Sequence, residues 1–211
     1  MTFRDDFAQM LKNRRATRRY KDSELDPTEV REFLELIQQA PTAFNLQDYS
    51  IVVVQDAEVR ERVYEAANKQ PQVASAPLLL AFVAEPDGWE RTLPKVAEQN
   101  LSTGFWDDND AKTRSERIAS FQEIRRTAGL TREFALRNAM IAATYGIVTA
   151  EAFGWASSPM TGFDDAKVKD ILGVPEECTV ALLLAVGESD ESPKAPGRLP
   201  LNARVFVDQW A

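Results

Sequence analysis

The stretch that most restricts the fold of this chain is TREFALRNAMIAATYGIVTAEAFG, residues 131–154, which is apolar on nearly every side when wound as a helix. Surface helices carry a polar face, so a helix without one is predicted to lie at the centre of a fold and to be covered all round. Its most apolar part, residues 139–154, is interrupted by Tyr145 and Glu151 and is shorter than the roughly 20 residues that span a bilayer. We therefore predict a buried helix of a soluble protein with no membrane partner.

Three apolar segments are predicted to be strands: YSIVVVQ at 49–55, LLLAFV at 78–83 and VALLLAVG at 180–187. Their lengths and β-branched residues are typical of buried strands. Apolar residues at helical spacing mark a helix at about 3–13, and a charged helix is predicted at about 57–67. A long helical region separates the second strand from the third. Together these elements predict an α+β fold, with a small sheet and many helices.

A further helix is indicated by LDPTEVREFLELIQQAP, residues 25–41. Asp26 suits the N-cap, Pro27 suits the first helical position, and Glu29 completes a capping box. Pro41 is predicted to end this helix, because proline cannot continue the helical hydrogen bonds. The chain therefore has a well-marked helix before its first strand.

Charge and residue usage exclude several kinds of protein. The formal net charge is -8 and the pI is near 4.8, so nucleic acids and anionic membranes should repel the chain at long range. The single cysteine, Cys178, rules out an intramolecular disulfide and favours a reducing compartment. The absence of histidine excludes Ser-His-Asp and Cys-His catalytic pairs and the usual zinc sites. The N-terminal residues lack the apolar core of a signal peptide, so we expect a cytoplasmic location.

The glycines are spread singly, and neither GxGxxG nor GxxxxGK[ST] occurs, so any bound phosphate must be held mostly by side chains. The first candidate is RRATRRYK, residues 14–21, with five cations. In an extended segment Arg14 and Arg18 face one side, whereas Arg15 and Arg19 face the other. Guanidinium groups suit phosphate, but two alternatives stay open. One is a solvated charge run that pairs with nearby acids. The other is a structural or nucleic-acid-binding module, against which the low pI argues.

Four further segments concentrate polar groups, at residues 40–50, 68–77, 157–163 and 194–200. The first two carry side-chain amides, which can donate to and accept from a polar ring. The third contains a proline and a glycine that would leave backbone N–H groups free to face a ligand. The fourth carries two cations. Each segment also fits an ordinary role, as a helix-ending turn, a polar loop, a helix-to-helix connection and a charged tail respectively.

The order and spacing of these segments resemble the nitroreductase family of FMN-dependent oxidoreductases, from about residue 10 to about residue 205. The resembling pieces are RRATRRY, APTAFNLQ, NKQPQVASAP, FALRNAMIAATYGIVTAEAFGWASSPMTGFD and GRLPL. The most specific piece is the long helix leading into SSPMTGF, which is close to the family's run ending in Pro-Met-Glu-Gly-Phe.

The resemblance implies a nitroreductase-like α+β fold that forms a single FMN-binding domain over residues 1–211. A central, mostly antiparallel sheet would be surrounded by helices. Family members are homodimers, so a C-terminal arm at about 196–211 would be exchanged onto the partner, with two flavins at the interface. FMN would carry electrons from NADH or NADPH to nitroaromatic, quinone or similar small acceptors, and the flavin rather than a side chain would do the chemistry. Acceptor choice would depend on residues 89–129. The alternative is an FMN-binding protein of this fold with little or no reductase activity.

The resemblance also implies which residues would contact FMN. Arg14 would hold the phosphate, and Arg198, with Lys194, would close that site. Arg18 would lie near N1 and O2 of the flavin, where negative charge develops on reduction.

Other segments would contact the flavin ring. Asn68 and Gln70 would hydrogen-bond to the pyrimidine ring, backbone groups of 159–162 would face N5, and residues 41–45 would reach the flavin of the other subunit. The full implied cofactor-binding set is Arg14, Arg15, Ala16, Arg18, Pro41, Thr42, Ala43, Asn45, Asn68, Gln70, Pro159, Met160, Thr161, Gly162, Lys194 and Arg198.

The chain departs from the family pattern at three places. Ala16 stands where serine is usual, which removes one hydroxyl donor to phosphate. Thr161 replaces the usual glutamate beside N5, and Asp48-Tyr49 replaces the common Pro-Trp pair after Gln47. These departures predict weaker FMN binding or a different acceptor, and Ala16 and Thr161 favour the alternative without reductase activity.

Overall fold

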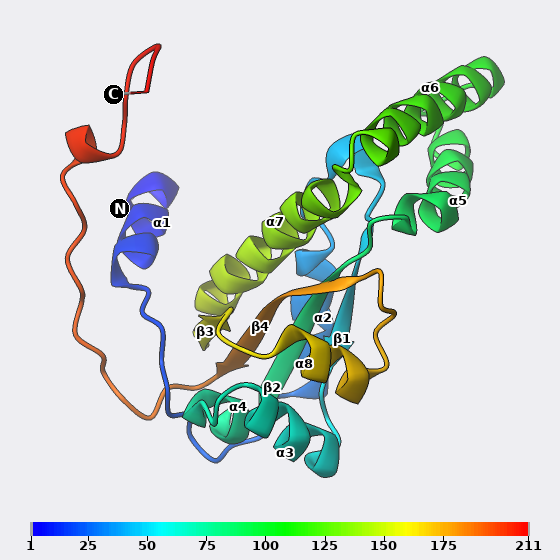
Figure 1. Cartoon of the computed structure of the whole chain (residues 1–211). Helices are drawn as coiled ribbons and strands as arrows, with labels where there is room; N and C mark the ends of the chain where they lie inside the picture. The colour runs from blue at the N-terminus through cyan, green and yellow to red at the C-terminus, as the bar shows by residue number, and fades with distance from the viewer. Residues whose placement is uncertain (1, 211) are drawn as a thin grey trace.

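The computed structural model describes residues 2–210 and contains a four-stranded antiparallel sheet in the order β1-β2-β4-β3 (Figure 1). The strands are β1 (Tyr49–Val53), β2 (Leu78–Ala84), β3 (Ala156–Met160) and β4 (Thr179–Gly187). The helices are α1 (Phe3–Asn13), α2 (Pro27–Ile37), α3 (Ala57–Ala66), α4 (Pro71–Ser75), α5 (Gly88–Ser102), α6 (Asp108–Thr127), α7 (Thr131–Ala152) and α8 (Asp165–Leu172). Two short 3₁₀ turns lie at Ala43–Asn45 and Leu201–Ala203. The expected α+β class and antiparallel sheet are confirmed.

The helix α2 begins where its capping residues predict. The Asp26 carboxylate accepts hydrogen bonds from the backbone N–H groups of Thr28 and Glu29, and Pro27 occupies the first turn. The helix ends at Ile37, however, so the prediction that Pro41 ends it was wrong by one turn. Single-turn hydrogen bonds at residues 39 and 40 finish the segment instead, because a residue preceding proline is driven out of the helical region.

The strand β3 was not predicted. The sequence around it was interpreted as a connection because two serines and Pro159 interrupt any apolar alternation. It forms by antiparallel pairing with the longer strand β4, which places Ser157 opposite Val186 and Met160 opposite Leu183. Pro159 is tolerated because β3 lies at one edge of the sheet, where a missing N–H leaves no ladder bond unmade.

The prediction that β1 is a buried strand was also wrong, because the strand forms but is only half-buried. All five of its residues are half-buried, whereas all seven residues of β2 are buried. The reason is position: β1 pairs only with β2 and forms the other edge of the sheet. Branched side chains identify a strand, but they do not say how many neighbours it will have.

Helices cover both faces of the sheet, and the alternation along β2 assigns its side chains to the two layers. Leu79 and Ala81 face the layer that contains α3 and α8. Leu80 and Phe82 face the layer that contains α2 and α7. In Figure 1 the helix α7 runs along one face of the sheet, and α3, α4 and α8 lie at the other. The sheet therefore separates two apolar cores.

The expectation that the helix at 131–154 is covered all round does not hold for this single chain. One face of α7, which includes Ala139, Ala142 and Gly146, is buried against the sheet. On the other face Met140, Ile141 and Tyr145 are each 37–38% exposed. Small residues let the helix approach the sheet closely, while the apolar residues opposite face away from the chain's own core.

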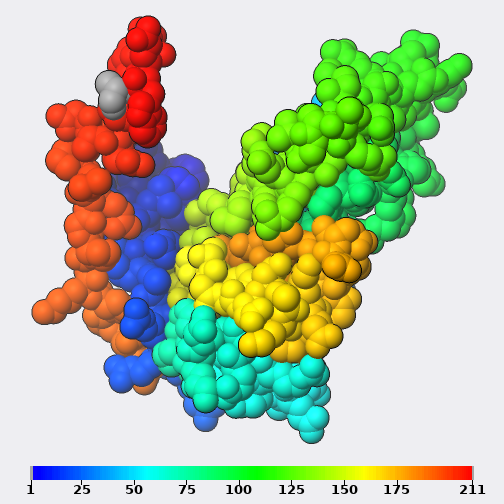
Figure 2. Space-filling view, viewed as in Figure 1, coloured from blue at the N-terminus to red at the C-terminus, as the bar shows by residue number. Residues whose placement is uncertain are grey.

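Two parts project from this body. The helices α5 and α6 extend from the sheet as a pair, and the C-terminal segment runs beside α1, away from the sheet (Figures 1 and 2). A small core of Leu46, Leu93, Trp106 and Ile118 holds the α5–α6 pair to the body. Within residues 2–210, no helix is both long and apolar enough to cross a bilayer.

Candidate cofactor site

The basic segment lies along the outer edge of β3. Ala16 forms a parallel bridge with Ser157, and Tyr20 forms an antiparallel bridge with Ser189. The Tyr20 hydroxyl is buried and donates to the carbonyl of Ala185, 3.0 Å away. The segment is extended, as its sequence predicted, and its position is fixed between β3 and the residues that follow β4.

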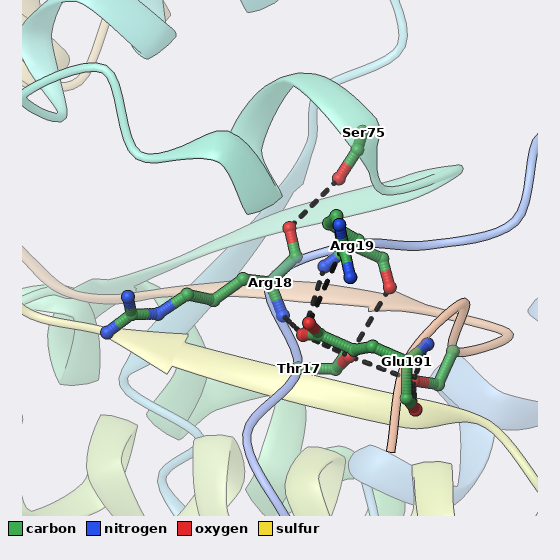
Figure 3. Close-up of polar contacts among 6 residues, drawn as sticks. Thr17, Arg18, Arg19, Ser75 and Glu191 are labelled. Atoms are coloured by element: carbon green, nitrogen blue, oxygen red, sulfur yellow. Dashed lines mark hydrogen bonds and ion pairs between the residues drawn. The ribbon is translucent and has the colours of Figure 1, made fainter. Parts of the chain in front are cut away.

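One carboxylate, Glu191, fixes the backbone of this segment (Figure 3). It accepts hydrogen bonds from the Arg18 N–H at 2.5 Å, the Thr17 hydroxyl at 3.0 Å and the Arg19 N–H at 3.3 Å. The Arg18 N–H, together with these neighbours, holds the pKa of Glu191 below its usual range. Sequence reasoning missed Glu191, because nothing local to a residue 173 positions away marks it as a partner of Arg18.

The four arginines differ in their partners, although the expected division into two faces stays a prediction. Arg19 forms an ion pair with Glu191 at 3.6 Å, and the Arg15 guanidinium donates to the carbonyls of Lys12 and Arg14. The Arg18 side chain is exposed, points away from Glu191 in Figure 3, and has no polar partner among the described residues. Arg14 Nη1 is buried and also lacks a hydrogen-bond partner within residues 2–210.

The interpretation as a charge run paired with acids therefore describes only part of the segment. It fits Arg19 and also Lys21, whose ammonium lies 2.8 Å from the Glu188 carboxylate. It does not fit Arg14 and Arg18. A buried guanidinium nitrogen without an acceptor is costly, and an anionic ligand is the usual partner of such a group.

A second acid lies behind the first two arginines. Glu151, on α7, is half-buried, and burial raises its pKa, while the charges of Arg14 and Arg15 act in the opposite direction. Arg14 is therefore near the C-terminal end of α7 and the start of β3.

The two amides expected at the flavin ring lie at the opposite end of β3. Asn68 Nδ2 and Gln70 Nε2 both donate to the Gly162 carbonyl, at 2.9 and 3.1 Å. Asn68 and Lys69 have left-handed backbones, with φ values of 56° and 55°. Non-glycine residues rarely adopt this conformation, and it occurs preferentially at ligand-binding loops. The structure thus places this loop against the segment after β3.

The backbone at 159–162 is only partly available to a ligand. Pro159 and Met160 belong to β3, and Met160 is buried. Thr161 and Gly162 follow the strand and are exposed, and their N–H groups donate to no atom of the described residues. Free N–H groups are therefore found at Thr161 and Gly162, while Pro159 has none to offer.

The tail residues are placed differently from one another. The Arg198 guanidinium donates to the carbonyls of Pro196 and Gly197, and with Arg15 it lines a cavity of about 290 Å³. Lys194 is exposed and forms no ion pair or hydrogen bond within residues 2–210. The chain itself thus brings Arg198, but not Lys194, beside the basic segment.

The loop at 41–45 lies far from the basic segment. The Ala43 N–H donates to the Asn138 side chain at 3.3 Å, and Asn138 and Glu151 are 13 positions apart on α7. That separation corresponds to about 20 Å along a helix. Three residues here, Phe44, Asn45 and Gln47, have φ values of 57°, 55° and 49°. One chain therefore holds two loops with unusual backbones at two separate places.

Asp48 is the second residue that sequence reasoning missed, since it was noted only as a departure from a family pattern. It is fully buried, and its Oδ1 accepts a 2.7 Å hydrogen bond from Asn138 Nδ2. Its Oδ2 has no partner among the described residues. Burial raises the pKa of Asp48 to about 6. The Asp48–Asn138 pair ties the 41–47 loop to α7.

The sequence and the fold of this chain were compared with those of known proteins. The model of the nitroreductase family matches residues 11–188. An NADH dehydrogenase of Thermus thermophilus is 32% identical over 193 residues, covering 92% of this chain and 91% of the relative.

Two solved structures have the same fold. The nitroreductase-type protein YdfN of Bacillus subtilis has a TM-score of 0.88 and 29% identity, covering 96% of this chain and 99% of its own. A nitroreductase-type protein of Exiguobacterium sibiricum, solved in complex with FMN, has a TM-score of 0.83 and 19% identity, with 98% and 97% covered.

Proposed function

This chain belongs to the nitroreductase family and is an NAD(P)H-dependent oxidoreductase, and we propose that it works with bound FMN on small nitroaromatic or quinone acceptors. When bound, FMN would accept a hydride equivalent from the nucleotide and pass electrons to the acceptor. The chain's own residues would bind and orient that group. The FMN-bound relative from Exiguobacterium sibiricum supports the cofactor.

The observation that carries the proposal is the unpartnered, buried Nη1 of Arg14. We assign Arg14 to the FMN phosphate, with Arg15, the backbone at Ala16, and Arg198 contributing from the neighbouring cavity. Lys194 would join them only by a movement of the tail. Arg18, whose backbone is fixed by Glu191, would direct its free guanidinium to the edge of the ring that gains charge on reduction.

The far end of β3 would hold the ring itself. Thr161 and Gly162 offer free N–H groups, and Met160 and Pro159 place them at the end of a strand. Asn68 and Gln70 already donate to the Gly162 carbonyl, and Gln70 Oε1 accepts from Gln72 Nε2 at 3.2 Å. Asn68 would therefore contribute its amide oxygen, and both residues would fix the loop. Because the contact beside N5 would be made by the backbone, Thr161 in place of glutamate is compatible with this arrangement.

We further propose that residues 1–211 form one domain that functions as a homodimer. The loop with Pro41, Thr42, Ala43 and Asn45 lies about 20 Å along α7 from the basic segment, so it could reach a flavin only in a partner subunit. The exposed apolar face of α7 supports such an interface.

The arm at 196–211 would be exchanged in this dimer. Several of its apolar side chains are between 54% and 83% exposed: Leu199, Leu201, Val205, Val207 and Trp210. A groove of about 460 Å³ runs beside β1, and its lining is mixed: Leu34, Ile51 and Val53 lie beside polar side chains such as Arg91, Lys95 and Gln99. An arm without a core of its own is stabilised by burying its apolar residues against a second chain.

The test is the visible spectrum of the purified protein with NADH and with NADPH. We expect a yellow protein that bleaches with one or both nucleotides and regains colour with a quinone. A yellow protein that does not bleach would instead support the FMN-binding alternative. We place the protein in the cytoplasm because its one cysteine, Cys178, is buried and unpaired.

The matched variants are Arg14→Ala with Arg18→Ala, and Arg62→Ala as the control. Arg62 is an exposed arginine on α3 whose one ion pair within residues 2–210 is with Asp170, at 3.9 Å. The double variant should be purified without flavin at low FMN, whereas the control should keep it. Equal flavin content in both proteins would falsify the assignment.

A further inference from the structure

A cavity of about 360 Å³ lies between the α5–α6 pair and the loop after α2. Its lining combines aromatic rings, amides and two arginines, and contains no acidic residue: Phe44, Asn45, Asn100, Phe105, Trp106, Arg114, Arg117 and Ile118. A volume of this size accommodates a one- or two-ring aromatic molecule. Its composition is unusual in a chain with a net charge of -8.

The arginines come from one face of α6, since residues 114, 117, 121 and 125 follow helical spacing. The Arg114 guanidinium lies 5.9 Å from the Trp106 ring centre, and that of Arg117 lies 5.6 Å from the ring centre of Phe121. Phe121 in turn stacks on Phe44, at 5.9 Å between ring centres. The guanidinium groups of α6 and the aromatic rings therefore pack against one another beside the loop that contains Phe44.

The two cations differ in how far they are neutralised. Arg114 forms an ion pair with Asp110 at 2.7 Å. Arg117 forms no ion pair or side-chain hydrogen bond with any described residue, and its guanidinium lies over the ring of Phe121. An uncompensated guanidinium beside flat apolar walls recognises an aromatic molecule that carries an acid group.

The cavity is also placed to serve the reaction. Asn45 lines it, and Asn45 belongs to the loop that the proposed dimer brings to the partner's flavin. A ligand in this cavity would thus lie beside the ring from which it takes electrons.

We propose that this cavity selects aromatic electron acceptors carrying a carboxylate or sulfonate, with Arg117 as the main anion-binding group and Arg114 assisting. For a quinone, two electrons and one proton derive from NAD(P)H and the second proton from water, which yields the hydroquinone and NAD(P)⁺. This assignment of substrate class rests on the proposed function.

The kinetic test compares 4-nitrobenzoate with 4-nitrobenzamide as acceptors for the FMN-loaded protein, under anaerobic conditions. Arg117→Gln should lower kcat/KM for the carboxylate by about tenfold, as expected for one charged hydrogen bond, and leave the amide nearly unchanged. The double variant with Arg114→Gln should lose more. Arg62→Gln, which removes the same charge from α3, should change neither acceptor. An equal effect of Arg117→Gln on both acceptors, or no effect, would overturn the proposal.

A binding measurement separates this proposal from the function on which it rests. Calorimetric titration with naphthalene-2-sulfonate, which cannot be reduced, should show binding that Arg117→Gln weakens by about tenfold and Arg62→Gln does not. If the protein oxidises no NAD(P)H with either nitro compound, the proposed reductase activity fails, whereas the titration still reports on the cavity. No binding to the wild-type protein, or equal binding to all variants, contradicts the cavity assignment.

Discussion

A single acidic side chain, Glu191, accepts three hydrogen bonds from residues 17–19 and so decides where the basic segment lies. Because its pKa is lowered in the folded protein, its contribution to stability is present above the unfolded pKa and is lost as the pH falls through the folded value. The effect of Glu191 on the cofactor would be indirect, through the position of Arg18.

We predict that Glu191→Ala lowers FMN affinity, because the Arg18 backbone loses its fixed acceptor. Flavin content after gel filtration at low FMN measures this. Glu188→Ala, which removes only the exposed ion pair with Lys21, is the control and should keep the flavin. A variant that loses thermal stability but keeps wild-type FMN affinity would show that Glu191 supports the fold alone.

The buried Asp48 changes stability with pH in the opposite direction to Glu191. Its pKa is raised from 3.8 to about 6, so the folded protein binds this proton more tightly than the unfolded chain. Stability therefore falls as the pH rises from about 4 to about 6, by up to roughly 3 kcal/mol, and is constant above that range.

We predict that Asp48→Asn is more stable than the wild type at pH 7 and that this gain shrinks towards pH 4. The asparagine side chain can keep the hydrogen bond from Asn138 and needs no charge in the interior. Melting temperatures of both proteins at pH 4, 5, 6 and 7 provide the measurement. A pH-independent difference would mean that Asp48 is not the titrating group.

At the scale of elements, the close approach of segments to the sheet depends on glycine. A Cβ at Gly187, at the end of β4, would lie 2.5 Å from two ring atoms of Pro77, which cannot move aside. A Cβ at Gly146, in α7, would lie 3.1 Å from a methyl of Leu184 and 3.2 Å from one of Ile37, and both side chains are flexible.

We predict that Gly187→Ala lowers the free energy of unfolding by about 1–3 kcal/mol, because a rigid neighbour must shift. Gly146→Ala is the comparison: alanine favours the helix by about 1 kcal/mol, which offsets its tighter contact, so the net change should be small. Chemical denaturation of both variants measures this. A Gly146 variant that is the less stable of the two would contradict the argument.

At the scale of the whole molecule, apolar side chains of α7 and of the tail are exposed in the described part of the chain. They lie on separate elements, yet each would be covered by a second copy. The proposed dimer thus explains both exposed apolar surfaces in one step.

We predict that a chain ending at residue 195 is monomeric and colourless, because the arm and Arg198 are both removed. Analytical ultracentrifugation at several protein concentrations, together with the spectrum, measures this. Met140→Glu on α7 tests the same interface without shortening the chain and should also shift the protein to monomer. Full-length protein that sediments as a monomer while binding FMN would contradict the dimer.

The sequence by itself determined the class of fold, the positions of α1, α2, α3 and α7 and three of the four strands, because capping residues and apolar spacing act locally. It also predicted separate faces for Arg14 and Arg18 and for Arg15 and Arg19, since side chains alternate in an extended segment. The structure distinguishes Arg18 from Arg19 but brings both Arg14 and Arg15 near Glu151. Only the tertiary structure decided four features: the formation of β3, the partial exposure of β1, the hydrogen bonds that Glu191 accepts and the burial of Asp48. Each depends on a partner distant in the sequence. A strand's burial, an acid's acceptors and a carboxylate's pKa are set by neighbours that only the folded chain brings together.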